Sequence, residues 1–208
     1  MAGITSFGQC PKPDYNFIAF AGSDKFRIIS DIMDENSFRQ INEYYYKDKN
    51  HIYYCDRVDI GSAHSLIKET FHLIENADPE TFEIYEKVSF SRDKNNVYYI
   101  GFLIKNADPK TFTPLSYHYG KDSARAFFKN CEIENVDLLT FEVKDNGGYY
   151  DFAYDKYFIY FHYQKEKIDM ETFVIDTSGY GCRDKNNIFY LHGTSFDGYI
   201  EKEKIVTE

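Results

Sequence analysis

Hydrophobic residues in this chain follow short polar turns in a recurring order. An Asp-Lys-Asn triplet is followed by one polar residue, one β-branched residue and two aromatic residues at 48–54, 93–99 and 184–190. Weaker copies begin at Asp122 and Asp155. Because Asp and Asn tolerate turn conformations and bond to their own backbone, each triplet predicts a hairpin turn and each aromatic run predicts the returning strand.

A second polar phrase recurs between these copies, at 76–82, 106–112, 135–141 and 168–173. Its Asp can cap a first helical turn and its Pro suits the first helical position. The phrase therefore predicts a single helical or 3₁₀ turn, and the Phe at its end is expected to bury that turn.

The two phrases together define a repeat. The lead aspartates from Asp93 onward lie 29, 33 and 29 residues apart, and the 45-residue step from Asp48 to Asp93 is one unit plus an insertion. This period predicts a mostly β protein of about five tandem ~30-residue hairpin repeats, forming an antiparallel meander or a solenoid-like sheet. With no Gly/Ser-rich or Pro-rich linker, 15–208 is predicted to be a single β-repeat domain, and 1–14 a loosely attached N-terminal arm.

The insertion in the second unit is the first irregular feature. The apolar residues at 66, 67, 71 and 74 lie at helical spacing, which predicts one amphipathic helix over 62–75. This helix could simply cover the sheet. Since insertions into a repeat often map to the binding face, Lys68, Glu69 and His72 are the alternative: candidate contacts to a partner protein.

The second irregular feature is the stretch 144–151, which presents two tyrosines beside carboxylates. Tyr with a charged rim is typical of interfaces, though also of ordinary hairpins. Residues outside the consensus are free of the packing demands shared by every unit, so the candidate partner contacts in this stretch are Asp145, Tyr149, Tyr150 and Asp151.

The repeated string resembles the DKNYY domain family, which is named for the residues seen at Asp93-Lys94-Asn95 and Tyr98-Tyr99. The resemblance covers roughly 24–200. It implies no catalytic residues, because the biochemical activity of the family is unknown. Some bacterial members look like neighbours of secreted polymorphic toxins, which implies an immunity role for a subset of the family.

Charge limits the classes of partner. The formal net charge is −10, and basic residues are diluted by Asp and Glu, so binding to nucleic acid or to an anionic membrane is disfavoured. The same charge favours a basic protein partner, although it could serve solubility alone. No secretory signal is visible in 1–13 and no segment approaches ~20 apolar residues, so a cytoplasmic protein is expected.

Cysteine and histidine give no metal pattern. Cys10, Cys55, Cys131 and Cys182 lack Cys-x-x-Cys spacing and are expected to be free thiols. None of the six histidines forms a His-x-His or His-Glu-x-x-His unit, so no metal and no cofactor is expected.

The repeated aspartates could be catalytic carboxylates or calcium ligands. However, an active site needs one constellation rather than five equal copies, and the motif lacks the distal bidentate Glu of a calcium loop. They are interpreted as turn-formers. No Gly-x-Ser-x-Gly elbow or phosphate loop is present. The Tyr pairs are expected to alternate across the sheet, with one ring buried and one on the outer face.

Two hypotheses follow. The first is a non-enzymatic, cytoplasmic protein-binding repeat protein, most concretely an immunity-type protein that neutralises a cognate bacterial toxin, possessing an acidic, Tyr-rich surface for a basic toxin domain. The second is a small-molecule or glycan-binding module, with or without hydrolytic activity, whose site lies in a Tyr-lined groove at the ends of the repeats.

Overall fold

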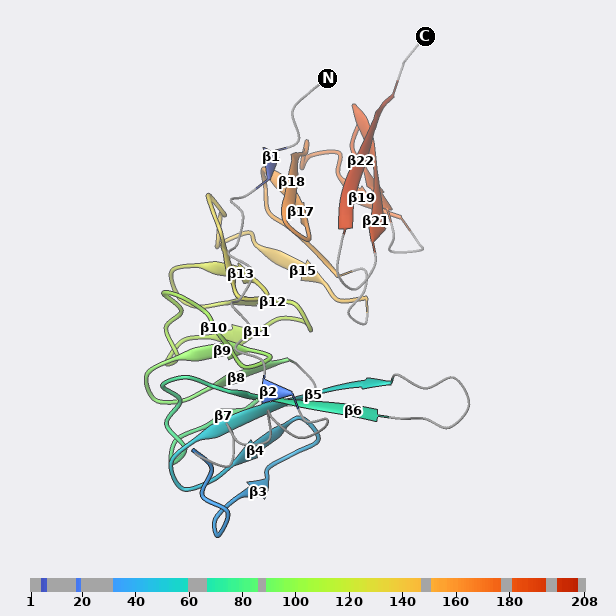
Figure 1. The fold of residues 1–208 in the computed structure, drawn as a ribbon. Coiled ribbons are helices and arrows are strands. Elements are labelled where there is room, and N and C mark those ends of the chain that lie inside the picture. The colour runs from blue at the N-terminus through green and yellow to red at the C-terminus, as the bar shows by residue number, and fades with distance from the viewer. Residues whose placement is uncertain are drawn as a thin grey trace. The chain divides into compact units, whose positions relative to one another are not determined.

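The computed structural model describes residues 5–6, 18–19, 32–59, 67–85, 89–146, 151–176, 181–193 and 198–205 (Figure 1). Within these ranges the protein is all-β: strands β1 to β22 form five antiparallel sheets, and no helix is present. Each sheet is built around four strands that are consecutive in sequence. The predicted fold class, a mostly β protein of about five tandem hairpin repeats, is confirmed.

The five sheets are numbered here in chain order. Sheet 1 contains β3 (Arg39–Gln40), β4 (Tyr45–Lys47), β5 (Ile52–Asp59) and β6 (Ile67–Leu73), with β2 (Ile18–Ala19) beside β6. Sheet 2 contains β7 (Glu83–Ile84), β8 (Phe90–Arg92), β9 (Val97–Tyr99) and β10 (Phe102–Leu103). Sheet 3 contains β11 (Thr113–Pro114), β12 (Tyr119–Lys121), β13 (Ala126–Phe128) and β14 (Cys131–Ile133).

Sheet 4 contains β15 (Glu142–Lys144), β16 (Phe152–Tyr154), β17 (Phe158–Phe161) and β18 (Gln164–Lys167), with β1 (Thr5–Ser6) beside β18. Sheet 5 contains β19 (Val174–Ile175), β20 (Gly181–Arg183), β21 (Asn187–Gly193) and β22 (Gly198–Lys204). Thr5–Ser6 was predicted to belong to a loosely attached arm, but these two residues pair with Gln164 and Lys165 of β18.

The lead aspartates lie in hairpin turns, as predicted. Asp48, Asp93, Asp122, Asp155 and Asp184 each join the second strand of a sheet to the third. In each turn the backbone N–H of the aspartate donates to the carbonyl three residues later. The consensus triplet is therefore the tip of the central hairpin of every sheet.

The second phrase belongs to the sheet that follows it. The N–H of Phe112 donates to the carbonyl of Asp108 and closes the predicted single turn, after which β11 begins at Thr113. The Phe112 side chain is buried and packs where a Cβ on Gly120 would meet its ring at 2.4 Å. Each repeat unit thus begins at the short turn and ends with the fourth strand of its sheet. The order of the two phrases in the sequence did not show where a unit begins.

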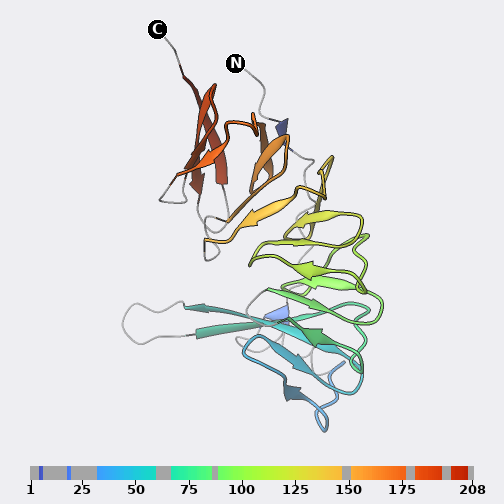
Figure 2. The same cartoon turned by 180° about the vertical axis from the view of Figure 1, so that it is seen from behind.

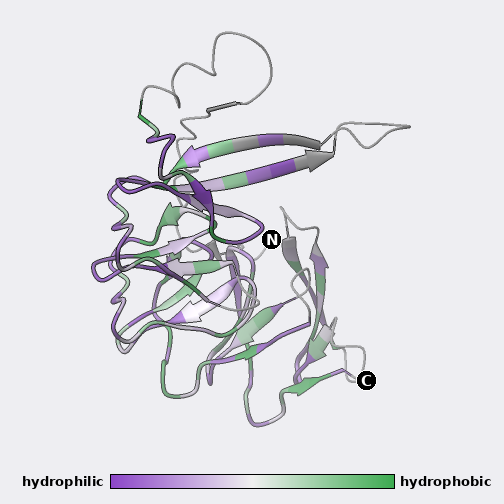
Figure 3. Cartoon of the chain, turned by 90° about the horizontal axis from the view of Figure 1, so that it is seen from below, coloured by the Kyte–Doolittle hydropathy of each residue, from purple (hydrophilic) through white to green (hydrophobic). Residues whose placement is uncertain are grey.

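The predicted helix over 62–75 is wrong. Ile67–Leu73 forms strand β6, which pairs antiparallel with β5 (Figure 2), and 62–66 lie outside the described residues. Phe71 stands opposite Cys55 and packs with Tyr53. The apolar spacing suited a helix, but the exposed edge of the aromatic strand β5 offered a hydrogen-bonded partner and an apolar face. Figure 3 shows polar and apolar residues mixed along both strands.

The chain, predicted to form one domain over 15–208, divides into two compact units. One comprises 11–85 and 90–103; the other comprises 1–10, 86–89 and 104–208. In the first unit, Tyr45 and Ile52 of sheet 1 pack with Tyr98 of sheet 2. In the second unit the core runs from sheet 3 into sheet 4 and from sheet 4 into sheet 5. Aromatic rings supply most of this buried volume.

Candidate functional site

The repeated aspartates are buried acceptors for hydrogen bonds of the fold. Asp93 Oδ1 accepts the backbone N–H groups of Asn95 at 2.7 Å and Asn96 at 2.8 Å. Its Oδ2 accepts the Tyr98 hydroxyl at 2.8 Å and the backbone N–H of Asp78 at 2.9 Å. The five lead aspartates have relative exposures between 0% and 5%. Buried carboxylates engaged on both oxygens in this way are structural groups.

The electrostatics of the first copy agree with this role. Burial by itself would raise the pKa of Asp48, but hydrogen bonds from the Asp34 N–H, the Asn50 N–H and the Tyr53 hydroxyl hold that pKa below its ordinary value. Burial, followed by the hydrogen bond to Asp48, raises the pKa of Tyr53. The carboxylate therefore stays ionised and the phenol protonated near neutral pH, which suits a fixed pair rather than proton transfer.

The Lys of the triplet reaches back to the short turn. Its ammonium group pairs with the carboxylate of the capping Asp, and the distance between Lys156 Nζ and Asp137 Oδ2 is 2.6 Å. Four units share this pairing: Lys49 with Asp34, Lys94 with Asp78, Lys156 with Asp137, and Lys185 with Asp169. In the remaining unit Ser123 donates its backbone N–H to Thr111 Oγ1. The Asp and the Lys of the consensus phrase thus have a structural explanation.

The predicted partner contacts in the insertion lie on β6. Lys68 pairs through its backbone with Val58, and its side chain lies outside the description. The half-exposed Glu69 carboxylate accepts the Arg57 Nε–H at 2.9 Å. His72 is buried, and this burial lowers its pKa. A buried imidazole offers a partner little surface, so the structure does not support a direct partner contact by His72.

The predicted contacts in 144–151 are similarly divided. Asp145 is exposed, whereas Tyr149 and Tyr150 lie outside the described residues. Asp151 is buried, accepts the backbone N–H of Asn146 at 2.9 Å and lies 3.8 Å from His118 Nδ1. Direct partner contact by Asp151 is therefore not supported. This stretch and β6 belong to different compact units.

The cysteines differ from the expectation of free thiols. Cys55 and Cys182 are free and buried, but Cys131 is disulfide-bonded. Cys10 lies outside the described residues. The prediction is therefore wrong for Cys131, because spacing along the sequence does not report which sulfurs approach each other in the fold.

The sequence reasoning missed an exposed surface on sheet 5, which we call the aromatic–acidic face: Tyr190, His192, Tyr199, Glu201 and Glu203. The rings of His192 and Tyr199 stack at 4.9 Å. His192 Nε2 lies 2.8 Å from Glu201 Oε2, and the Tyr190 hydroxyl donates to Glu203 Oε2 at 3.3 Å. The available signal was the spacing of two residues that places aromatic side chains at 190, 192 and 199 and acidic ones at 201 and 203 on one face of the sheet.

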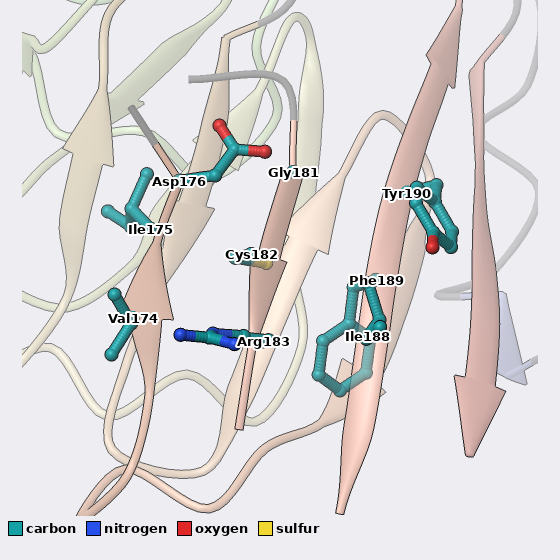
Figure 4. A pocket seen from close by; sticks show the side chains of 9 residues that line it. All are labelled: Val174, Ile175, Asp176, Gly181, Cys182, Arg183, Ile188, Phe189 and Tyr190. Carbon is teal, nitrogen blue, oxygen red and sulfur yellow. The ribbon is translucent and has the colours of Figure 1, made fainter. Parts of the chain in front are cut away.

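A hollow of about 390 Å³ lies beside this face. It is lined by Val174, Ile175, Asp176, Gly181, Cys182, Arg183, Ile188, Phe189 and Tyr190 (Figure 4). Gly181 leaves room for the Asp176 carboxylate, since a Cβ there would lie 2.6 Å from Asp176 Oδ2. Asp176 lies toward one end of the hollow, and Val174 and Arg183 toward the other (Figure 4). Ring faces and carboxylates together suit cationic groups, and ring faces also suit sugars.

In the described part of the chain, no group of three or more His, Cys, Asp or Glu side chains is arranged to hold a metal ion. No helix in the described ranges has the length and apolarity needed to cross a membrane.

These observations define a β-repeat protein in which a buried Asp stabilises the central turn of each sheet. The model of the DKNYY family matches residues 20–102 and 90–205, and the chain belongs to this family. Comparison with curated proteins and comparison with solved structures each give no match.

Proposed function

We propose that this chain is a non-enzymatic binding protein, of the immunity type, that occludes a basic domain of a cognate bacterial toxin. The supporting observation is that its acidic groups fall into two sets, one buried and one exposed. The repeated carboxylates are buried and hydrogen-bonded within the fold, whereas Glu201 and Glu203 are exposed beside Tyr190 and Tyr199. Exposed tyrosines next to carboxylates resemble the contact surfaces of proteins that bind other proteins.

A basic protein is the partner that the charge favours. With a net charge of −10, the molecule attracts cationic surfaces and repels phosphate backbones and anionic membranes. Among the predicted partner contacts with described side chains, Asp145 is exposed and Glu69, which pairs with Arg57, is half-exposed, and both carry negative charge.

A cytoplasmic location belongs to the same proposal. The disulfide at Cys131 is the observation against it, because disulfides persist mainly in oxidising compartments. The redox state of Cys131 in whole cells distinguishes the cytoplasm from an oxidising compartment. Rapid alkylation traps this state and mass spectrometry reads it. A reduced Cys131 supports the cytoplasm, and an oxidised one contradicts it.

One observation favours glycan binding as the second candidate. The hollow beside Tyr190 combines a partly exposed ring with polar groups from Asp176 and Arg183, and such pockets hold small polar ligands. Calorimetric titration with oligosaccharides tests this alternative. Saturable heat that disappears in a Tyr190→Ala variant would favour it over toxin binding.

The test of the main proposal uses the neighbouring reading frame. Its C-terminal domain is expressed in a host with this chain, without it, or with an unrelated protein of equal negative charge. We expect growth to be rescued by this chain alone and the two proteins to co-elute in gel filtration. Killing that is equal in all three strains, or a neighbouring frame that encodes no secreted protein, contradicts the immunity role.

A further inference from the structure

Within each compact unit, a sheet packs on the next one through an equivalent face, which we call the forward face. In sheet 3 the forward face carries Tyr119, Ala126 and Phe128, and these residues pack on Ala153 and Tyr160 of sheet 4. The arrangement recurs where Phe152, Ile159 and Phe161 of sheet 4 pack on Phe189 and Leu191 of sheet 5. It recurs a third time where Tyr45 and Ile52 of sheet 1 meet Tyr98 of sheet 2.

The register places the aromatic–acidic face on the forward face of sheet 5. Gly181 pairs with Tyr190, and Tyr190 pairs with Glu201. Measured from the lead aspartates, Gly181, Ile188 and Tyr190 correspond to Phe152, Ile159 and Phe161 of sheet 4. The positions that face sheet 5 in sheet 4 thus recur on the face of sheet 5 that is turned away from sheet 4.

All three positions are buried in sheet 4. In sheet 5 Gly181 is buried, Ile188 is half-buried and Tyr190 is exposed. The relative exposure of Phe161 is 0%, and that of its counterpart Tyr190 is 40%. Tyr199 and Val174, on the same face, are 51% and 52% exposed. An end unit of a repeat array commonly replaces apolar residues on this face with polar ones. Here large apolar side chains and rings remain exposed among the charges.

We propose that the forward face of sheet 5 is a docking surface for an arginine-bearing segment of a basic protein. This proposal rests on the proposed function. It names the surface that would bind the basic partner and the side chain of the partner that this surface would recognise. The guanidinium groups stack on Tyr190 and Tyr199 and bond to Glu201 and Glu203, and one side chain enters the hollow over Gly181.

The charge on the face selects this occupant. Glu201 and Glu203 stand two residues apart on one side of β22, a separation of roughly 7 Å that can hold two cationic side chains. Arg183 is the cation of the same face, and it lies toward the Val174 end of the hollow (Figure 4). A second copy of this chain is disfavoured by mutual repulsion, since each copy carries −10.

Arginine fits this surface better than lysine does. Its planar guanidinium can stack on a phenol ring and at the same time donate two hydrogen bonds to one carboxylate. The ammonium group of lysine is a compact, strongly hydrated charge without that shape. Recognition by shape as well as charge therefore predicts a preference between the two residues at equal net charge.

The experiment uses synthetic peptides of matched length, (Arg-Gly)₆ and (Lys-Gly)₆, titrated calorimetrically and by NMR into the full chain. The test variants are E201Q/E203Q and Y190A/Y199A. The matched control is E134Q/E171Q, which removes two carboxylates from exposed positions elsewhere in the same compact unit and changes the net charge equally. Melting temperatures confirm that all three variants fold.

We expect (Arg-Gly)₆ to bind, with shifted resonances concentrated in β19 to β22. Each test variant should weaken binding about tenfold, as expected from losing two modest cation–π or charge contacts, and the control less than twofold. Equal weakening by test and control variants would reveal general acidic attraction and overturn the proposal. So would equal affinity for the lysine peptide, or no binding at all. If growth protection by the chain nevertheless holds, the immunity role stands and the assignment of this face fails.

Discussion

The consensus aspartate is the residue on which each unit depends. In the copy at Asp93, one side chain accepts three backbone N–H groups and one phenol. It joins the tip of the hairpin, the returning strand and the preceding short turn. No other residue type offers two acceptor oxygens at this length, since Glu is longer and Asn replaces one acceptor with a donor. This requirement explains why Asp occupies this position in all five units.

Replacing Asp93 should therefore cost more than the loss of an ordinary cap. We expect Asp93→Ala to lower the free energy of unfolding by about 3 kcal/mol, because three partly buried backbone N–H groups and the buried Tyr98 hydroxyl lose their acceptor. Asp93→Asn should cost less, since one acceptor oxygen is kept. Urea unfolding measures both, and Asn95→Ala at the exposed turn is the control, with an expected change of at most about 0.5 kcal/mol. A similar effect for Asp93→Ala and the control would refute the central role of the carboxylate.

At the scale of elements, the short turn and the central hairpin act as one piece. The Thr of the turn accepts the N–H of the triplet Lys, as Thr81 does from Lys94, while the Asp–Lys ion pair closes the outside. The Asn before the turn has a reason as well. Asn76, Asn106 and Asn135 have φ near 60°, a left-handed conformation that Asn tolerates better than most residues.

These ion pairs predict a dependence of stability on pH. The hydrogen bond from Lys94 lowers the pKa of Asp78 below its model-peptide value of 3.8, and Lys156 and Lys185 do the same for Asp137 and Asp169. A depressed folded-state pKa means that the stabilisation is complete above the unfolded-state pKa and is lost as pH falls through the folded-state value.

The contribution of these pairs to the free energy of unfolding should therefore be level from pH 7 to about 5 and fall below about pH 4. Urea titrations at several pH values measure this profile. A variant with Lys94, Lys156 and Lys185 all changed to Gln should show a shallower fall than the parent protein. Parallel profiles for the two proteins would mean that these pairs contribute nothing to the acid sensitivity.

Hairpins and repeat number were readable from the sequence because turn chemistry is local. Strands such as β7, β10 and β11 were not, since each is two residues long and carries no periodicity to detect. The helix expected over 62–75 failed for a related reason. Helical spacing is a local property, whereas pairing of β6 with β5 depends on the edge that β5 presents.

At the scale of the whole molecule, the exposed face of sheet 5 shows what a repeat sequence hides. Phe161 and Tyr190 occupy equivalent positions in the motif, so the sequence assigns them equal roles. Their exposure differs because sheet 5 packs on Phe161, whereas no sheet in the described part of the chain packs on Tyr190. A candidate site of this kind is therefore found from the packing of the sheets and not from a comparison of the repeats.

The sulfur chemistry of the molecule gives a third prediction. Burial, followed by the nearby Glu69 and Asp176 carboxylates respectively, raises the pKa of Cys55 and Cys182, so neither thiol should react with iodoacetamide in the folded protein. In urea without reductant, Cys55 and Cys182 should be alkylated and Cys131 should not. Mass spectrometry of the peptides reads the result. Alkylation of Cys131 before reduction would contradict the disulfide.

The hydrogen bonds that the lead carboxylates accept from the short turns span 14 to 18 residues. A unit can consequently close as soon as its own ~30 residues have left the ribosome, because short loops close with little entropic cost. Strands β1 and β2 differ, since Thr5 pairs with Lys165 of β18 and Ile18 pairs with Phe71 of β6. During synthesis the five sheets can form in chain order, while β1 has to wait for the fourth sheet before it joins the fold.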